Sequence, residues 1–191
     1  MHAPRIDTGR LVLAGLDPED AERMFAYRSH PLVTCFQLWR PARIEDVQEM
    51  IRTMEQTVFG EMDSWYQLGI YLRSSGELIG DLGMHFLSPE NQQTEIGFTI
   101  APDHQRCGYG TEAVGAAVDY LFGTLHKHRV TASVAPENSA SRALLEKIGM
   151  REEAHFRQSV WINDHWEDDV VYAVLGAEWQ SERTGGPSPE R

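Results

Sequence analysis

The stretch between residues 94 and 134 constrains the fold of this chain more than any other. A strand pattern from Thr94 to Ile100 runs into the loop 104–113, which reads HQRCGYGTEA and opens an apolar helix. Apolar residues at helical spacing mark that helix, namely Val114, Ala117, Val118, Leu121 and Leu125. A short β-branched strand, Arg129 to Val134, comes next. Strand, loop, helix and strand in this order indicate an α/β organisation.

A hairpin is expected before this unit. Residues 66–72 alternate between apolar and other side chains, SSGE at 74–77 is a turn signal, and residues 82–86 alternate again. A first strand is also predicted at 10–13. Three amphipathic helices are predicted at 17–28, 44–58 and 138–149, and a C-terminal hairpin is predicted from strands at 154–162 and 166–175.

Length and charge bound the class of protein. The chain has 191 residues, so we expect one domain over residues 1–180 and a disordered tail at 181–191, which is poor in hydrophobic residues. No apolar stretch approaches the ~20 residues that a membrane helix needs. The first residues lack the apolar core of a secretory signal, so the cytoplasm is the expected location.

The net charge of −12 disfavours nucleic acid as a partner and favours a cationic one. Cys35 and Cys107 match no zinc spacing, and we expect no metal site. We expect a monomer or a homodimer.

Three interpretations of the glycine loop compete. Residues 108–113 satisfy the dinucleotide pattern G-x-G-x-x-A, but residues 101–106 intervene after the strand, and a terminal hairpin follows. In the second interpretation the glycines only form a tight loop. In the third, the backbone N–H groups from Arg106 to Thr111 cradle a pyrophosphate at the helix N-terminus, beside the Arg106 charge.

The loop and its neighbours resemble one family. Residues 105–110, QRCGYG, resemble the Q/R-x-x-G-x-G/A motif of the GNAT acyltransferases, which bind acetyl-CoA. EIGFTIAP at 95–102 resembles the strand before that motif, and APENSASRALLEKIGM at 135–150 resembles the second signature. GRLVLAGL at 9–16 and INDHWEDDVVYAVLGAEW at 162–179 resemble the ends of the branch that includes the ribosomal-protein N-terminal acetyltransferases.

The resemblance spans about residues 5–180 and implies an α+β fold. Its sheet would be mixed and mostly antiparallel, flanked by about four helices, with a splayed central strand pair. Acetyl-CoA would pair with the backbone near Phe98 and Ile100. Asn138 would bind the pantetheine arm, with Ser141 and Arg142 nearby. The pyrophosphate would lie against the loop residues Gln105, Arg106, Cys107, Gly108, Tyr109, Gly110 and Thr111.

The resemblance also implies direct attack of an amine on the thioester, without a covalent acyl-enzyme. In agreement, no Ser-His-Asp or Cys-His set stands out in the sequence. An amine is largely protonated at pH 7, so a base must remove a proton. Glu95, on the strand before the loop, is the first candidate, although a glutamate paired on a sheet face is the alternative. His85 is the second candidate, followed by His104, Asp81 and His155.

One position departs from the family pattern. Many members carry a Tyr in the second signature helix as general acid for the leaving thiolate, and Leu145 occupies that position here. Either Ser141 protonates the thiolate, or the thiolate leaves unaided, since a thiol has a pKa of about 8.5.

The acceptor site is expected between the first two helices, the loop HPLVTCFQLWRP at 30–41 and the last hairpin. Candidate walls are Trp39, Trp65, Trp161 and Trp166. We hypothesise an N-acetyltransferase that acts on a protein N-terminus or on a small amine such as a polyamine, amino acid or aminoglycoside. The alternative is a non-catalytic acyl-CoA-binding regulatory module of the same fold.

Overall fold

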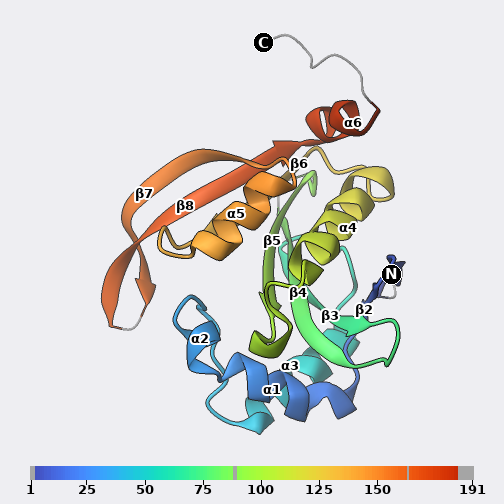
Figure 1. The fold of residues 1–191 in the computed structure, drawn as a ribbon, viewed down its shortest axis with the longest axis vertical. Helices are drawn as coiled ribbons and strands as arrows, with labels where there is room; N and C mark the ends of the chain where they lie inside the picture. The colour runs from blue at the N-terminus through green and yellow to red at the C-terminus, as the bar shows by residue number, and fades with distance from the viewer. Residues whose placement is uncertain (1–2, 88–89, 163, 185–191) are drawn as a thin grey trace.

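A computed structural model of the protein describes residues 3–87, 90–162 and 164–184, which form one eight-stranded sheet with helices on both faces (Figure 1). The strand order is β1-β2-β3-β4-β5-β6-β8-β7. The strands are β1 (Ile6–Asp7), β2 (Leu11–Gly15), β3 (Ser64–Leu72), β4 (Leu78–Leu87), β5 (Gln93–Ile100), β6 (Arg129–Val134), β7 (Arg151–Ile162) and β8 (His165–Leu175). Within the described residues only β5 and β6 pair in parallel. The predicted mixed, mostly antiparallel sheet is confirmed.

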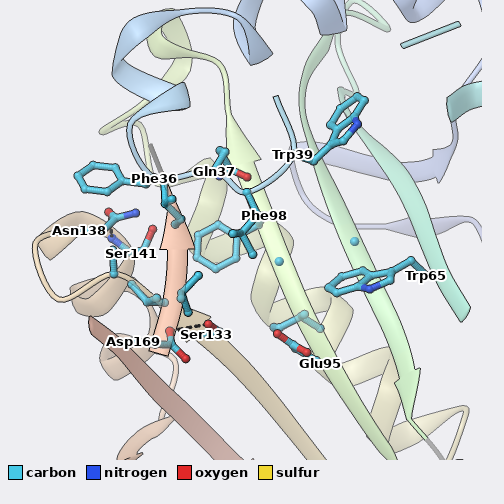
Figure 2. A pocket seen from close by; sticks show the side chains of 18 of the residues that line it. Phe36, Gln37, Trp39, Trp65, Glu95, Phe98, Ser133, Asn138, Ser141 and Asp169 are labelled. Carbon is cyan, nitrogen blue, oxygen red and sulfur yellow. Dashed lines mark hydrogen bonds between the residues drawn. The ribbon is translucent and has the colours of Figure 1, made fainter. Parts of the chain in front are cut away.

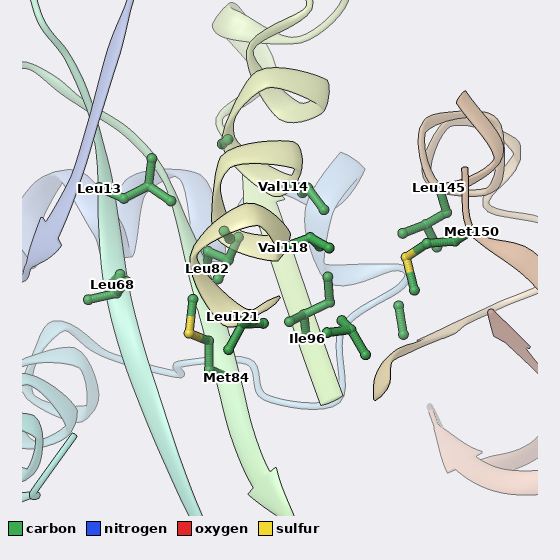
Figure 3. Packing of buried hydrophobic residues seen from close by; sticks show 14 of the residues in the cluster. Leu13, Leu68, Leu82, Met84, Ile96, Val114, Val118, Leu121, Leu145 and Met150 are labelled. Atoms are coloured by element: carbon green, nitrogen blue, oxygen red, sulfur yellow. The ribbon is translucent and has the colours of Figure 1, made fainter. Parts of the chain in front are cut away.

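The helices pack on both faces of the sheet, because successive side chains of each strand point to opposite faces. They are α1 (Ala21–Arg28), α2 (Pro31–Thr34), α3 (Ile44–Gln56), α4 (Tyr109–Gly123), α5 (Ser139–Lys147) and α6 (Gly176–Thr184), with 3-10 turns η1 (Pro18–Asp20) and η2 (Pro102–His104). On one face, α4 buries its apolar stripe against β4 and β5 (Figure 3), through Val114, Val118, Leu121, Leu82, Met84 and Ile96. On the other face, Tyr27 and Arg28 of α1 bond to Asp81 of β4.

The two central strands separate partway along their length. Between β5 and β6 the described pairs are Gln93–Arg129, Thr94–Val130 and Glu95–Thr131. Beyond Glu95, β5 continues to Ile100 on the β4 side, and β6 continues to Val134 on the β8 side. The facing edges of the two strands therefore leave backbone groups available in the gap, and the predicted splay is confirmed.

Two predicted segments contain structure that the sequence pattern did not show. The loop 30–41 includes the short helix α2, which begins at Pro31 and is capped by the ring nitrogen of His30. The tail predicted as disordered from residue 181 is helical through Thr184, because α6 docks through Trp179, whose indole N–H donates to Asp119 at 2.8 Å. Residues 185–191 lie outside the described residues.

No helix in the described part of the chain is long and apolar enough to cross a membrane.

Candidate active site

The main cavity, of about 520 Å³, opens where β5 and β6 separate (Figure 2). β5 contributes Glu95 and Phe98 to the lining, α5 contributes Ser141, and the segment after α2 contributes Phe36, Gln37 and Trp39. Its lining includes four of the residues proposed for the site from the sequence, which are Glu95, Phe98, Asn138 and Ser141. Segments far apart in the sequence meet here, since the lining extends from Arg28 to Asp169.

Glu95 belongs to a polar row that crosses three strands. Trp65, His85 and Glu95 are successive cross-strand partners on β3, β4 and β5. The rings of Trp65 and His85 stack with centroids 4.8 Å apart. Nδ1 of His85 lies 3.8 Å from Oε2 of Glu95, and both side chains keep partial contact with solvent. The first and second candidate bases are thus neighbours, and a proton on Glu95 has an imidazole beside it.

The opposite side of the cavity carries amide and hydroxyl groups. Asn138 caps α5 by accepting the Ser141 backbone N–H at 3.1 Å through Oδ1. Within the described residues its amide nitrogen has no acceptor, so it is available to a ligand. Phe98 lies between this side and Glu95 (Figure 2). Ser141 also lines the cavity from the first turn of α5.

Acidic residues of β8 that the sequence analysis did not single out also line the cavity, and they are Glu167, Asp168 and Asp169. Asp169 accepts the Ser133 hydroxyl at 2.6 Å. Asp168 accepts the Gln158 backbone N–H at 2.8 Å and contacts His155 at 2.8 Å. These two contacts, the backbone bond first, lower the pKa of Asp168. The run EDD at 167–169 is visible in the sequence as a cluster of acidic residues. The cluster lines the cavity only because the strand order places β8 next to β6.

A buried ion pair supports the aromatic rim. Asp81, which has no exposed surface, accepts the Tyr27 hydroxyl at 2.7 Å and pairs with Arg28. Burial alone would lower the pKa of Arg28, but the Asp81 carboxylate outweighs this effect and the pKa is raised. Arg28 in turn donates to Gln37 at 3.1 Å and lies over the ring of Trp39, 5.3 Å from its centroid. Asp81 is therefore a structural anchor, whereas the sequence had placed it among the minor candidate bases.

The glycine loop lies outside this cavity, at the N-terminus of α4. Arg106 is exposed and makes no ion pair or hydrogen bond within the described residues. Gln105 donates to the Ile100 carbonyl at 3.0 Å and thereby shapes the turn after β5. The first N–H groups of α4, which begins at Tyr109 and includes Thr111, have no partner inside the helix. The loop thus offers backbone donors and one unpaired cation to an anion.

Glycine is required at positions 108 and 110 for different physical reasons. Gly108 has φ 78°, a left-handed conformation that favours glycine. Gly110 is buried, and a Cβ there would lie 2.8 Å from Cδ1 of Leu144 on α5. Glycine at 110 therefore permits the close packing of α4 on α5.

A second network holds the loop to the start of the chain. Glu112 accepts the Thr8 hydroxyl at 2.6 Å, the Arg10 backbone N–H at 2.8 Å and Nε of Arg10 at 2.6 Å. Arg10 also donates to the Cys107 carbonyl at 3.0 Å and covers the ring of Tyr109. Arg10 was missed from the sequence, where it appeared only as the start of a strand.

Several other candidates lie away from the cavity. Arg142 donates to the Pro136 carbonyl and to the Tyr172 hydroxyl, each at 3.2 Å, so its guanidinium is already engaged. Leu145 is fully buried in the apolar core, where a leaving thiolate has no access. Ile100 is half-buried against the same core.

The four tryptophans proposed as walls of the acceptor site divide into two pairs. Trp39 and Trp65 line the main cavity. Trp161 and Trp166 contact each other edge to face on the β7–β8 hairpin, with ring centroids 5.3 Å apart, and line no part of that cavity. Trp161 instead borders a smaller hollow with Leu38.

Comparisons with known proteins agree on one family. A family model described as an acetyltransferase (GNAT) domain matches residues 10–151. The chain is 34% identical over 173 residues to the uncharacterized N-acetyltransferase YoaA of Bacillus subtilis, covering 90% of this chain and 97% of that protein. It is 26% identical over 185 residues to the ribosomal protein uS5-alanine N-acetyltransferase of Escherichia coli, covering 92% of each. A solved GNAT-family acetyltransferase from Bacillus anthracis is similar with a TM-score of 0.81 at 27% identity, covering 92% of this chain and 100% of that one.

Proposed function

Because this chain belongs to the GNAT acetyltransferase family, we propose that it transfers the acetyl group of acetyl-CoA to a primary amine that binds beside Glu95. The observation that carries this proposal is the shared cavity, which Glu95 on β5 lines together with Asn138 and Ser141 on α5. A base and a set of donors for the acyl carrier then border one space, with Phe98 between them.

The residues present fit acetyl-CoA as the donor substrate. The unpaired edges of β5 and β6 match the amides of a pantetheine arm, and the unused amide of Asn138 adds a donor. Arg106 and the first N–H groups of α4 would hold the pyrophosphate, since a helix N-terminus favours an anion. Gln105, Cys107, Gly108 and Tyr109 would contribute to this seat mainly through the backbone.

Acetyl-CoA supplies a thioester, whose C–S bond breaks as the C–N bond to the acceptor forms. Glu95 accepts the proton that the amine must lose, and His85 at 3.8 Å receives or shares it on the way to solvent. Leu145 occupies the position of the Tyr that serves as general acid in many family members. Ser141 would take over that role here and donate a proton to the thiolate. The core position of Leu145 gives this residue no part in the reaction.

The lining of the cavity favours a cationic acceptor. Glu95, Glu167, Asp168 and Asp169 are acidic, and the one arginine of the lining, Arg28, is neutralised by Asp81. Carboxylates around a cleft raise the local concentration of a protonated amine. The E. coli relative is named as an alanine N-acetyltransferase of ribosomal protein uS5, and we include a protein N-terminus in the cytoplasm among the acceptors.

Release of free thiol from acetyl-CoA tests the proposal. The panel contains a peptide with N-terminal alanine, a linear polyamine, an amino acid and an aminoglycoside. We expect turnover with at least one cationic amine. Tight binding of acetyl-CoA without turnover on any amine would instead support the non-catalytic module.

Glu95→Gln tests the role of the base. We expect a rate loss of about 10²- to 10⁴-fold at neutral pH and a smaller relative loss at high pH, where more amine is already neutral. Glu55→Gln, an exposed change on α3 outside the cavity, is the matched control and should retain the wild-type rate. A wild-type pH profile in Glu95→Gln would remove Glu95 from the mechanism.

A further inference from the structure

Gly97 lies in the middle of β5 at a position where the backbone does not demand glycine. The described glycines with positive φ are Gly60, Gly76, Gly108 and Gly149, and Gly97 is not among them. A glycine inside a strand weakens it, and often marks a place where a ligand or another backbone approaches closely. The missing side chain at Gly97 therefore has a cause other than conformation.

Within the described residues, no protein atom fills the space beside Gly97. A Cβ placed there meets no heavy atom within 4 Å. Its cross-strand partner Gly83 is the opposite case, because a Cβ there would lie 2.8 Å from Oε1 of Gln67 and 3.1 Å from the ring of Trp65. Side chains that lie across Gly83 explain that glycine, whereas Gly97 faces open space.

The open space at Gly97 belongs to the main cavity. Gly97 lines it and, by strand alternation, faces the same side of the sheet as Glu95. Two strand residues span about 7 Å, so the carbon atoms next to an amine at Glu95 fall within reach of Gly97. Trp65 and Trp39 flank this part of the cavity (Figure 2).

We propose that Gly97 is a specificity-determining residue, against whose backbone the carbon chain next to the acceptor amine lies. This inference rests on the proposed function and deepens it by naming how the acceptor is selected. A side chain at 97 would occupy the volume of that carbon chain. The acceptor kcat/KM would fall most for acceptors that are branched beside the amine, and least for acceptors with an unbranched methylene chain.

The test compares Gly97→Ala and Gly97→Val with the wild type. The probes are 1,4-diaminobutane, which is unbranched beside the amine, and a peptide with N-terminal alanine, which is branched there. For Gly97→Val we expect about a 10- to 200-fold lower acceptor kcat/KM, as for one misfitting group in a pocket, with a smaller loss for Gly97→Ala. The loss should be larger for the peptide, and the affinity for acetyl-CoA should not change.

Gly115→Ala is the matched control. This buried glycine of α4 also has no heavy atom within 4 Å of an added Cβ, but it does not line the cavity, so its kinetics should remain those of the wild type. Valine favours strands, so Gly97→Val should melt as the wild type does; if it does not fold, Gly97→Ala decides.

The outcomes separate this inference from the proposed function. An active wild type whose acceptor kcat/KM is unchanged in Gly97→Val, or a loss confined to acetyl-CoA affinity, overturns the role of Gly97 alone. A wild type that binds acetyl-CoA and acetylates no amine overturns the proposed function, and this inference with it.

Discussion

Replacing Asp81 by Asn should cost this protein a large part of its stability. Asp81 is fully buried and is the partner of an almost equally buried Arg28. Tyr27 donates to the same carboxylate at 2.7 Å, and Nε of Arg28 donates at 3.0 Å. Asn keeps the shape but removes the charge, so the guanidinium remains buried without compensation.

The expected magnitude follows from that uncompensated charge. Breaking a buried ion pair by removing one partner costs about 3–5 kcal/mol in free energy of unfolding. In a chain of this size each kcal/mol corresponds to about 2–4 °C, so the melting temperature should fall by about 6–20 °C. Trp39 and Gln37 rest on Arg28, so the KM for the acceptor should rise as well.

Urea denaturation of single and double variants provides the assay. Arg28→Met combined with Asp81→Asn should cost less than the sum of the two single changes, since the double variant has no unpaired charge. The exposed pair Arg23–Glu77 is the control, and Glu77→Gln should cost less than about 1 kcal/mol. A loss below about 1 kcal/mol for Asp81→Asn, or strict additivity in the double variant, would refute the reasoning.

Two further predictions concern the loop at the start of α4. Arg106→Ala should weaken acetyl-CoA binding about tenfold, equivalent to about 1.4 kcal/mol, and leave kcat nearly unchanged; titration calorimetry checks this, and unchanged affinity would separate the loop from the pyrophosphate. Glu112→Gln should destabilise the fold by about 1–2 kcal/mol at pH 7. Desolvation alone would raise the pKa of Glu112, but hydrogen bonds from Thr8 and Arg10 outweigh this effect. They lower the pKa of Glu112 below its ordinary 4.5. Its stabilising effect is therefore complete above pH 4.5 and is lost as the pH falls through the lowered value, so urea denaturation at pH 7 and pH 3 should show the variant approaching the wild type in acid. A difference independent of pH would contradict this assignment.

The sequence determined the local elements and the donor motif. Period-two alternation identified β3 and β4, and the spacing of apolar residues identified α4, because each pattern needs only a few consecutive residues. The helix expected from residue 138 is α5, which Asn138 caps through its side chain. The resemblance of residues 105–110 pointed to the family, which the domain match over residues 10–151 shows.

Only the tertiary structure decided which side chains meet. Asp169 reaches the cavity because β8 pairs with β6, and no local pattern specifies that neighbour. Asp81 becomes an anchor because α1 crosses β4, and Gly110 is small because α5 packs on α4. Gly83 and Gly97 are alike in sequence, yet one is covered by Trp65 and Gln67 while the other faces open space. Long-range pairing sets these contacts, so strand order and helix packing turn a recognisable fold into a particular acceptor site.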